Sequence, residues 1–224
     1  MFNGNSFVEL LPMDNVEHKV SIEIDFKAYS MEGILVYAQQ SPELKEGQDY
    51  LSIVLVDGHV EFRYDLGTGP ALIRTPKRIR LGHWHRIQAK RWHRDGMLKL
   101  DDYDNIDGHS QGSLRSLDIG QPTYVGGIPH SDDLRLGNVS QLMKNLGVSK
   151  LTGLDGCIKR FKIGHRDVKI QSASEPMAMR RVSLNECHDN QLFNPCGHNP
   201  CLNGGICIVS APVLDANPYR YNNW

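Results

Sequence analysis

The sequence predicts an all-β fold, an antiparallel β-sandwich or jelly roll. Short segments between residues 6 and 170 alternate apolar and polar side chains with period two, as half-buried strands do. Turn-forming residues separate these segments at intervals of roughly 8–12 residues, which is typical of sandwiches. No window of about 12 residues or more has a convincing helical period. Residues 139–147 are expected to hold at most one short helical turn.

The first strands are the clearest. Residues 21–28 read Ser-Ile-Glu-Ile-Asp-Phe-Lys-Ala, a strict alternation that predicts a strand with one buried face. Residues 51–56 and 59–64 flank the dipeptide Asp57-Gly58. Because this dipeptide tolerates the positive φ angles of a tight primed turn, the two segments are predicted to form a β-hairpin.

Later segments continue the pattern. Residues 86–91 and 97–100 predict a second hairpin around Asp95-Gly96. Residues 124–127 end a further strand with two glycines, and residues 158–163 supply another. These segments predict strands on both sides of residues 139–147.

Composition limits the function. The chain has 224 residues, 25 Lys and Arg against 26 Asp and Glu, and 40% apolar residues, so it is too apolar to be disordered. A net charge of −1 argues against a globally basic nucleic-acid-binding protein. No apolar stretch is long enough to span a membrane, and the N-terminus has no signal-peptide pattern.

All five cysteines lie in the last third of the chain: Cys157, Cys187, Cys196, Cys201 and Cys207. An odd number cannot pair internally, which indicates a free thiol or an incomplete C-terminal module. After residue 187 the composition becomes polar and rich in turns, and three cysteines fall within twelve residues. Such a segment is too short to bury a core and needs covalent links instead. The expected organisation is therefore a domain over residues 1–187, a small cysteine-rich module over 192–207 and a disordered tail over 208–224.

An ordered set of short motifs runs through the large domain. They are Phe2-Asn3-Gly4, Phe7-Val8-Glu9-Leu10, Asp49-Tyr50-Leu51, Val56-Asp57-Gly58-His59, Phe62-Arg63-Tyr64-Asp65-Leu66-Gly67, Gly82-His83-Trp84-His85, Tyr124-Val125-Gly126-Gly127, Leu154-Asp155-Gly156-Cys157-Ile158 and Cys187. This set resembles the laminin G-like family over residues 2–187, and most closely the laminin G domains of agrin and perlecan. The stretch from Cys196 to Cys207 resembles the first half of an epidermal-growth-factor-like (EGF-like) module.

The two resemblances imply how the cysteines pair. The laminin G-like family has one disulfide near its last strand, which corresponds to Cys157–Cys187. In EGF-like modules the first and third cysteines pair, which corresponds to Cys196–Cys207. Cys201 is then left unpaired, because residues 208–224 contain no cysteine. The small module is accordingly expected to be partial.

The laminin G-like resemblance also implies a calcium site. Members that bind calcium use two acidic side chains and two backbone carbonyls, which correspond to Asp49 and Asp118 and to Leu66 and Ser116. Ca²⁺ prefers such oxygen ligands, and so few charged ligands predict weak binding, with a dissociation constant on the order of 10⁻⁴–10⁻³ M. The alternative is that both acids simply end strands without binding a metal. A second acidic cluster, residues 101–108, does not match the EF-hand spacing and is expected to be a solvated hairpin loop.

Residues 74–94 contain eight Lys and Arg residues and no acid. The candidates for binding anionic glycans are Arg74, Lys77, Arg78, Arg80, Lys90 and Arg91. The guanidinium group suits carboxylates and sulfates, and such binding is weakened by salt. A solvated sheet face is an equally simple explanation of this charge.

Together these features predict an extracellular matrix or basement-membrane binding module that recognises anionic glycans with the help of Ca²⁺. The resemblance implies α-dystroglycan-type glycans or heparan sulfate as partners, with no nucleic acid, no membrane insertion and a monomeric domain. The alternative is a calcium-stabilised module that binds an acidic protein. Asn138-Val139-Ser140 is an N-glycosylation sequon. The sequence contains no recognised catalytic motif, so we do not expect an enzyme.

Overall fold

The computed structural model of the chain describes residues 1–41, 49–129, 137–172, 174–182, 184 and 187. The chain divides into two units, Met1–Asp189 and Asn190–Trp224, and all the described residues belong to the first. Among the described residues, no helix has the length and apolar character needed to cross a membrane. The predicted small module and tail, residues 192–207 and 208–224, lie outside the described residues.

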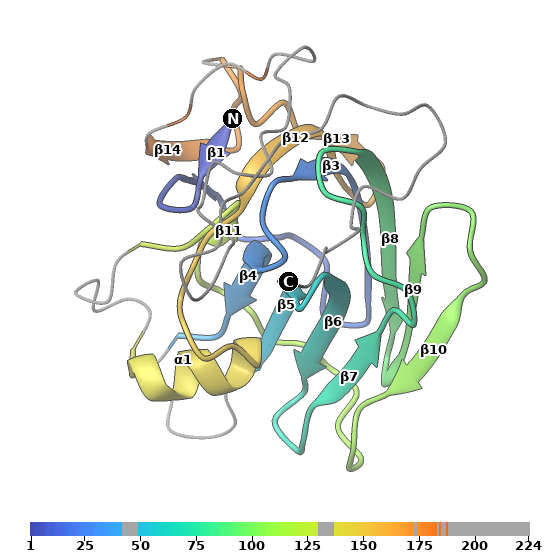
Figure 1. The fold of residues 1–224 in the computed structure, drawn as a ribbon. Helices are drawn as coiled ribbons and strands as arrows, with labels where there is room; N and C mark the ends of the chain where they lie inside the picture. Colours follow the sequence, from blue (N-terminus) through green and yellow to red (C-terminus); the bar gives the residue numbers. More distant parts are fainter. Residues whose placement is uncertain (42–48, 130–136, 173, 183, 185–186, 188–224) are drawn as a thin grey trace. The chain divides into compact units, whose positions relative to one another are not determined.

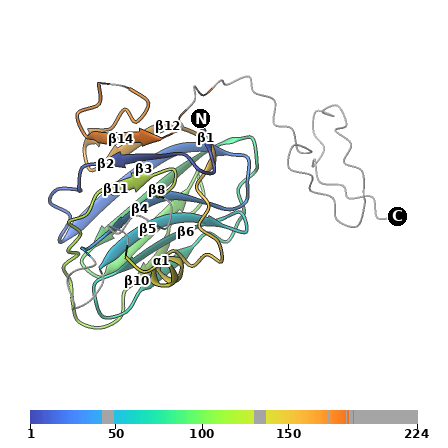
Figure 2. The ribbon, with the colours of Figure 1, turned by 90° about the vertical axis from the view of Figure 1, so that its left-hand side faces the viewer.

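Two antiparallel β-sheets pack face to face, which confirms the predicted sandwich (Figures 1 and 2). The first sheet has the strand order β1-β12-β3-β8-β9-β10, and β13 pairs with β12. Its strands are β1 (Phe2–Asn3), β3 (Lys19–Ala28), β8 (Trp84–Trp92), β9 (Asp95–Leu100), β10 (Ile106–His109), β12 (Asp155–Ile163) and β13 (Arg166–Asp167). The second sheet has the order β14-β2-β11-β4-β5-β6-β7. Its strands are β2 (Phe7–Leu10), β4 (Gly33–Gln39), β5 (Tyr50–Val56), β6 (His59–Asp65), β7 (Ala71–Arg74), β11 (Thr123–Val125) and β14 (Ala178–Val182).

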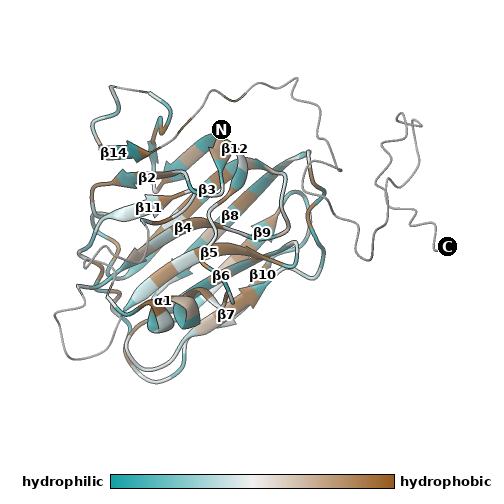
Figure 3. Ribbon diagram, turned by 60° about the vertical axis from the view of Figure 1, so that its left-hand side comes forward, coloured by the Kyte–Doolittle hydropathy of each residue, from teal (hydrophilic) through white to brown (hydrophobic). Residues whose placement is uncertain are grey.

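The main hydrophobic core lies between the sheets. Along β3, the apolar residues predicted to face inward are buried, and the polar residues Ser21, Glu23 and Asp25 between them are half-buried, whereas Lys27 near the end of the strand is buried. Figure 3 shows this alternation of hydropathy along the strands. Fully buried core residues come from both sheets, and they include Ile22, Ile24, Phe26, Ile87 and Phe161 of the first sheet and Leu51, Ile53, Leu55, Val60 and Phe62 of the second.

The two hairpins differ in how well the sequence predicted them. Asp57 and Gly58 join β5 to β6 with φ angles of 51° and 74°, as expected of a primed turn. The second turn is not at Asp95-Gly96. Trp92 pairs with Asp95 in the ladder, so the two residues between them form the turn, and His93 has a φ of 52°. Asp95 and Gly96 instead begin β9.

One helix, α1 (Val139–Leu146), covers part of the outer face of the second sheet. It is longer than the single turn that the sequence predicted. Its apolar residues Leu142 and Leu146 pack in a second buried cluster with Tyr37, Tyr50, Val54 and Tyr124. The Oδ1 atom of Asn138 accepts hydrogen bonds from the N–H groups of Ser140 and Gln141 at 2.8 and 3.3 Å, which caps the helix. The helix ends at Gly147, whose φ of 68° is the left-handed conformation usual after a helix.

The predicted Cys157–Cys187 disulfide is present, with 5.9 Å between the two Cα atoms. It joins β12 to the chain that follows β14. Cys196, Cys201 and Cys207, with the predicted Cys196–Cys207 pair, lie outside the described residues.

Candidate functional site

The predicted calcium ligands lie in loops at one end of the second sheet. Asp49 directly precedes β5, and Leu66 directly follows β6. Because Tyr50 of β5 pairs with Asp65 of β6, Asp49 and Leu66 stand at neighbouring positions just beyond the last paired residues. The strand register therefore brings the first predicted carboxylate beside the first predicted carbonyl.

Asp118 reaches the same place from a distant part of the chain. Its backbone N–H donates a 2.8 Å hydrogen bond to the Oδ2 atom of Asp49, although the two residues are 69 positions apart. The Ser116 hydroxyl donates to the Oδ1 atom of Asp118 at 2.8 Å. The fold thus places three of the four predicted ligand residues in direct contact, and the fourth, Leu66, follows the strand that pairs with β5.

Asp65 shapes the loop that carries Leu66. Its Oδ1 atom accepts hydrogen bonds from the N–H groups of Gly67 and Gly69, at 2.8 and 3.0 Å. Gly67 has a φ of 89°, which glycine adopts without strain. Among the described residues, no hydrogen bond ends on the carbonyl oxygen of Leu66 or Ser116. Within that part of the chain, both oxygens keep lone pairs that a cation could use.

Without a cation, the site disfavours the negative charge of the Asp49 carboxylate. The pKa of Asp49 is raised to about 6, chiefly by burial and also by the negative charges of Asp118 and Asp65. The N–H of Asp118 and the positive charge of Arg91 act in the opposite direction, but they do not outweigh burial. A cation between the carboxylates would offset this repulsion.

The donor set fits a hard cation. The described residues contain no cluster of three or more His, Cys, Asp or Glu side chains arranged to hold a metal ion. Two carboxylates with backbone carbonyls are instead the kind of oxygen ligands that Ca²⁺ accepts, with water completing the coordination. A zinc site would need nitrogen or sulfur ligands, which these loops do not bring together.

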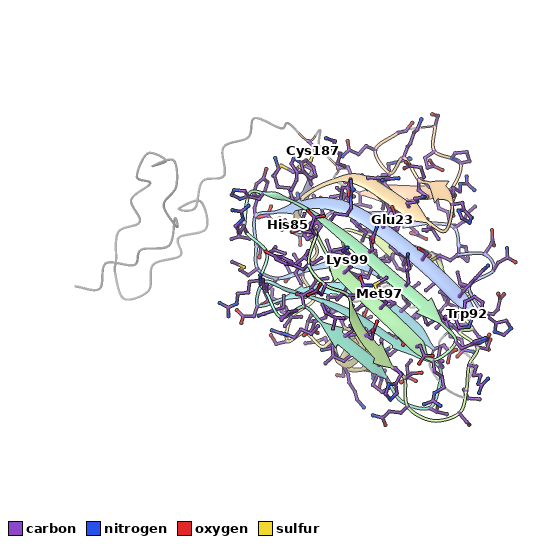
Figure 4. The ribbon with its side chains drawn as sticks, turned by 90° about the vertical axis from the view of Figure 1, so that its right-hand side faces the viewer. Glu23, His85, Trp92, Met97, Lys99 and Cys187 are labelled. Atoms are coloured by element: carbon purple, nitrogen blue, oxygen red, sulfur yellow. A yellow bond between two sulfur atoms is a disulfide. The ribbon has the colours of Figure 1, made fainter. Side chains whose placement is uncertain are left out.

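The predicted glycan-binding residues are divided between the two sides of the sandwich. Arg74 lies at the end of β7 on the outer face of the second sheet, where it pairs with the buried Glu61. Lys90 lies on the outer face of the first sheet, the face shown in Figure 4. Arg74 and Lys90 therefore cannot contribute to one continuous patch.

Lys77, Arg78 and Arg80 lie between them, in the connection from β7 to β8. Lys77 stacks over the ring of Tyr103, with 4.0 Å from Nζ to the ring centroid, and Arg78 pairs with Asp57. Within the described part of the chain, the side chains of Arg80 and Lys90 form no ion pair. This connection is the densest part of the predicted basic surface.

The prediction for Arg91 is wrong. Its side chain is only 2% exposed, and it points inward from β8 together with Ile87 and Ala89. The guanidinium donates hydrogen bonds to the backbone carbonyls of His93, Val16 and Glu17. A glycan on the surface cannot reach it.

His85 and Asp101 are structural. The Nδ1 atom of His85 lies 2.7 Å from the Oδ2 atom of Asp101, and Nε2 accepts the N–H of Arg80 at 2.9 Å. The Oδ1 atom of Asp101 accepts the N–H of Arg86 at 2.7 Å. These contacts fix the loops at the ends of β8 and β9.

The sequence prediction includes neither Asp65, which holds the loop around Leu66, nor the inward direction of Arg91. An aspartate two residues before a glycine is a signal for the turn that Asp65 forms. Ile87, Ala89 and Arg91 occupy alternate positions of β8, so their side chains point to the same face of the sheet. The period-two pattern therefore indicates an inward side chain for Arg91.

Comparison with family models matches residues 26–169 to the family described as "Laminin G domain". Over 93% of its length the chain is 27% identical to the mouse (Mus musculus) "Basement membrane-specific heparan sulfate proteoglycan core protein", and 28% identical to rat (Rattus norvegicus) "Pikachurin". It spans only 5% and 19% of these two proteins. Among solved structures, mouse laminin α1 chain domains LG4-5 match with a TM-score of 0.64 and 18% identity, over 81% of this chain and 44% of that one.

Proposed function

The chain contains a domain of the laminin G family, and from this we propose that it is an extracellular binding module that recognises anionic glycans with the help of a bound Ca²⁺ ion. The observation that carries the proposal is the hydrogen bond from Asp118 to Asp49, which joins two acids 69 residues apart at the end of β5. Asp49 and Asp118, with the carbonyl oxygens of Leu66 and Ser116, would hold the ion.

When bound, the ion would supply positive charge and open coordination positions for an oxygen of the ligand. The chain's own residues do the rest. Asp65 holds the loop around Leu66, and Ser116 orients the Asp118 carboxylate. These contacts would hold the proposed oxygen ligands in place before a cation or a glycan binds.

The basic residues would bind sulfate or carboxylate groups along the glycan. We assign this role first to Lys77, Arg78 and Arg80, while Arg74 and Lys90, on the outer faces of different sheets, would each bind a separate anionic group. Arg80 and Lys90 keep their ammonium or guanidinium groups free of acidic partners in the described residues, so they are the strongest candidates. The glycans proposed are heparan sulfate or the acidic chains of dystroglycan.

A glycan array with calcium and with EDTA tests the proposal. We expect calcium-dependent binding of uronic-acid-containing dystroglycan-type glycans, and heparin binding that falls mainly with added salt. Asp49→Ala should abolish the first and spare the second, while Arg80→Ala should weaken the second. The exposed Lys150, which follows α1, provides Lys150→Ala as a matched control for loss of one positive charge.

Two results would contradict the proposal. One is an unchanged calcium titration of Asp49→Ala by calorimetry, which would remove the metal site. The other is undiminished binding to partners stripped of their glycans, which would favour the alternative of a protein-binding module stabilised by calcium.

We also propose that Asn138 carries an N-linked glycan. Its side chain is exposed, and its Oδ1 atom is used by the helix cap while Nδ2 is the atom that takes the sugar. Glycosylation therefore leaves the cap intact. Secretion from a eukaryotic cell should give a chain whose mass falls on treatment with a peptide N-glycosidase. Ser140→Ala should remove that shift without removing Asn138, and an unshifted wild-type chain would refute the assignment.

The location and the small module are proposals of the same kind. An extracellular location agrees with the disulfide and with the basement-membrane name of the mouse relative. Residues 192–207 are proposed to be part of an EGF-like module, with Cys196 paired to Cys207.

A further inference from the structure

A buried guanidinium lies beneath the loops that carry the proposed metal ligands. Arg91 donates through Nη1 to the carbonyl oxygen of His93 at 2.6 Å, and through Nη2 to that of Glu17 at 3.0 Å. Nη2 also donates to the carbonyl of Val16. Hydrogen bonds from a charged donor are stronger than neutral ones, and a buried charge is costly without them. Arg91 therefore fixes the backbone of residues 16–17, which lie in the connection between β2 and β3.

The same backbone reaches the proposed metal site. The carbonyl oxygen of Glu17 also accepts a 2.8 Å hydrogen bond from the N–H of Leu117. Leu117 is fully buried and stands between Ser116 and Asp118, two of the proposed ligand residues. From Asp118 the next hydrogen bond leads to Asp49. A continuous series of contacts thus runs from Arg91 through Glu17 and Leu117 to both carboxylates.

We propose that Arg91 is a positioning residue for the cation site, which holds residues 116–118 against Asp49 through the carbonyl of Glu17. This inference rests on the proposed calcium site. The positive charge of Arg91 also acts on Asp49, where it lowers the pKa of that carboxyl. Arg91 therefore affects the site in two ways, by geometry and by charge, and the two can be separated by substitution.

Arg91→Lys keeps the charge but cannot donate to three carbonyls in the same planar arrangement. It should lower the calcium affinity measured by calorimetry by about tenfold, as loss of residues that orient metal ligands commonly does. In EDTA, the amide hydrogen of Leu117 should exchange faster than in the wild type. Arg86→Lys is the matched control. Arg86 lies on the same strand but faces outward, where it pairs with Asp25, so neither measurement should change.

Arg91→Met is the second variant. For every variant, thermal unfolding first establishes the temperature range in which it is folded. Arg91→Met should lower the calcium affinity less than Arg91→Lys, because removal of the positive charge also removes its repulsion of the ion. Unchanged Leu117 exchange and unchanged affinity in Arg91→Lys would overturn the inference. Higher affinity in Arg91→Met with unchanged affinity in Arg91→Lys would overturn it too, since Arg91 would then act only by repelling the ion. Failure of the wild-type chain to bind calcium would instead overturn the proposed function on which the inference rests.

Discussion

At the scale of single residues, ionisation of Asp49 opposes folding when no cation is bound. The pKa of this carboxyl rises from 3.8 to about 6 in the folded chain, first through burial and then through the neighbouring acids. A raised carboxyl pKa means that the native state binds the proton more tightly than the unfolded state. The stability that protonation supplies is therefore lost as the pH rises from about 4 to about 6.

Asp49→Asn should remove this dependence. In EDTA, the variant should gain about 2 kcal/mol of unfolding free energy relative to the wild type between pH 4 and pH 7. Urea unfolding of both proteins at the two pH values measures this difference, and the comparison cancels the titration of other groups that the two proteins share. Calcium at pH 7 should stabilise the wild type and not the variant. A stability difference that does not vary with pH would show that Asp49 titrates normally.

At the scale of elements, Gly147, the residue that follows α1, lies close to a side chain of the second sheet. A Cβ atom at Gly147 would lie 2.1 Å from the guanidinium carbon of Arg63, and Arg63 pairs with the buried Glu61. Gly164 has a similar positive φ, 58°, but a Cβ there would meet nothing within 4 Å. The two glycines share the same backbone requirement and differ in their surroundings.

Gly164→Ala should therefore cost about 1 kcal/mol of stability, from the backbone conformation alone. Gly147→Ala should cost at least about 1 kcal/mol more, because Arg63 must move away from Glu61. Chemical denaturation of the two variants measures both values. Equal losses would mean that Arg63 moves aside freely.

At the scale of the whole molecule, the pairing of the five cysteines can be tested. The chain should contain two disulfides and one free thiol, with Cys157–Cys187 present in the structure and Cys201 as the free thiol. Labelling of the unfolded, unreduced chain with a maleimide, followed by mass spectrometry of its peptides, should find one label, on Cys201. A label on Cys196 or Cys207 would refute the EGF-like pairing.

The sandwich could be predicted because its strands have a single buried face, so that residues such as Ile22 and Ile24 recur at every second position. The meeting of Asp49 with Asp118 depends on the fold as a whole, and only the resemblance to a family made it predictable. The extent of α1 was underestimated because eight residues contain too few turns to show a helical period. Its stability comes from packing on Tyr37 and Tyr124, which are distant in sequence.

The other errors had local causes. Asp95-Gly96 has the composition of a tight turn, but the turn lies at His93 and Arg94, where His93 takes a positive φ of 52° that is uncommon for residues other than glycine. The charge of Arg91 predicts a surface position, whereas its place in the strand indicates the core. In both places, the residue type predicted one conformation and the position in the strand ladder another, and the structure follows the position in the ladder.

The Cys157–Cys187 bond has a mechanical consequence. Cys187 lies after β14 in the chain, so tension applied to the residues that follow it passes through the disulfide directly to Cys157 in β12. Residues 158–186, including β14, are thereby shielded from the load. The β1 strand pairs with Asp155 and Gly156, immediately beside Cys157, so force entering from the N-terminal end meets the same strand. While the disulfide is intact, β12 bears tension from both directions. Reduction of the disulfide would shift the load to the pairing of β14 with β2.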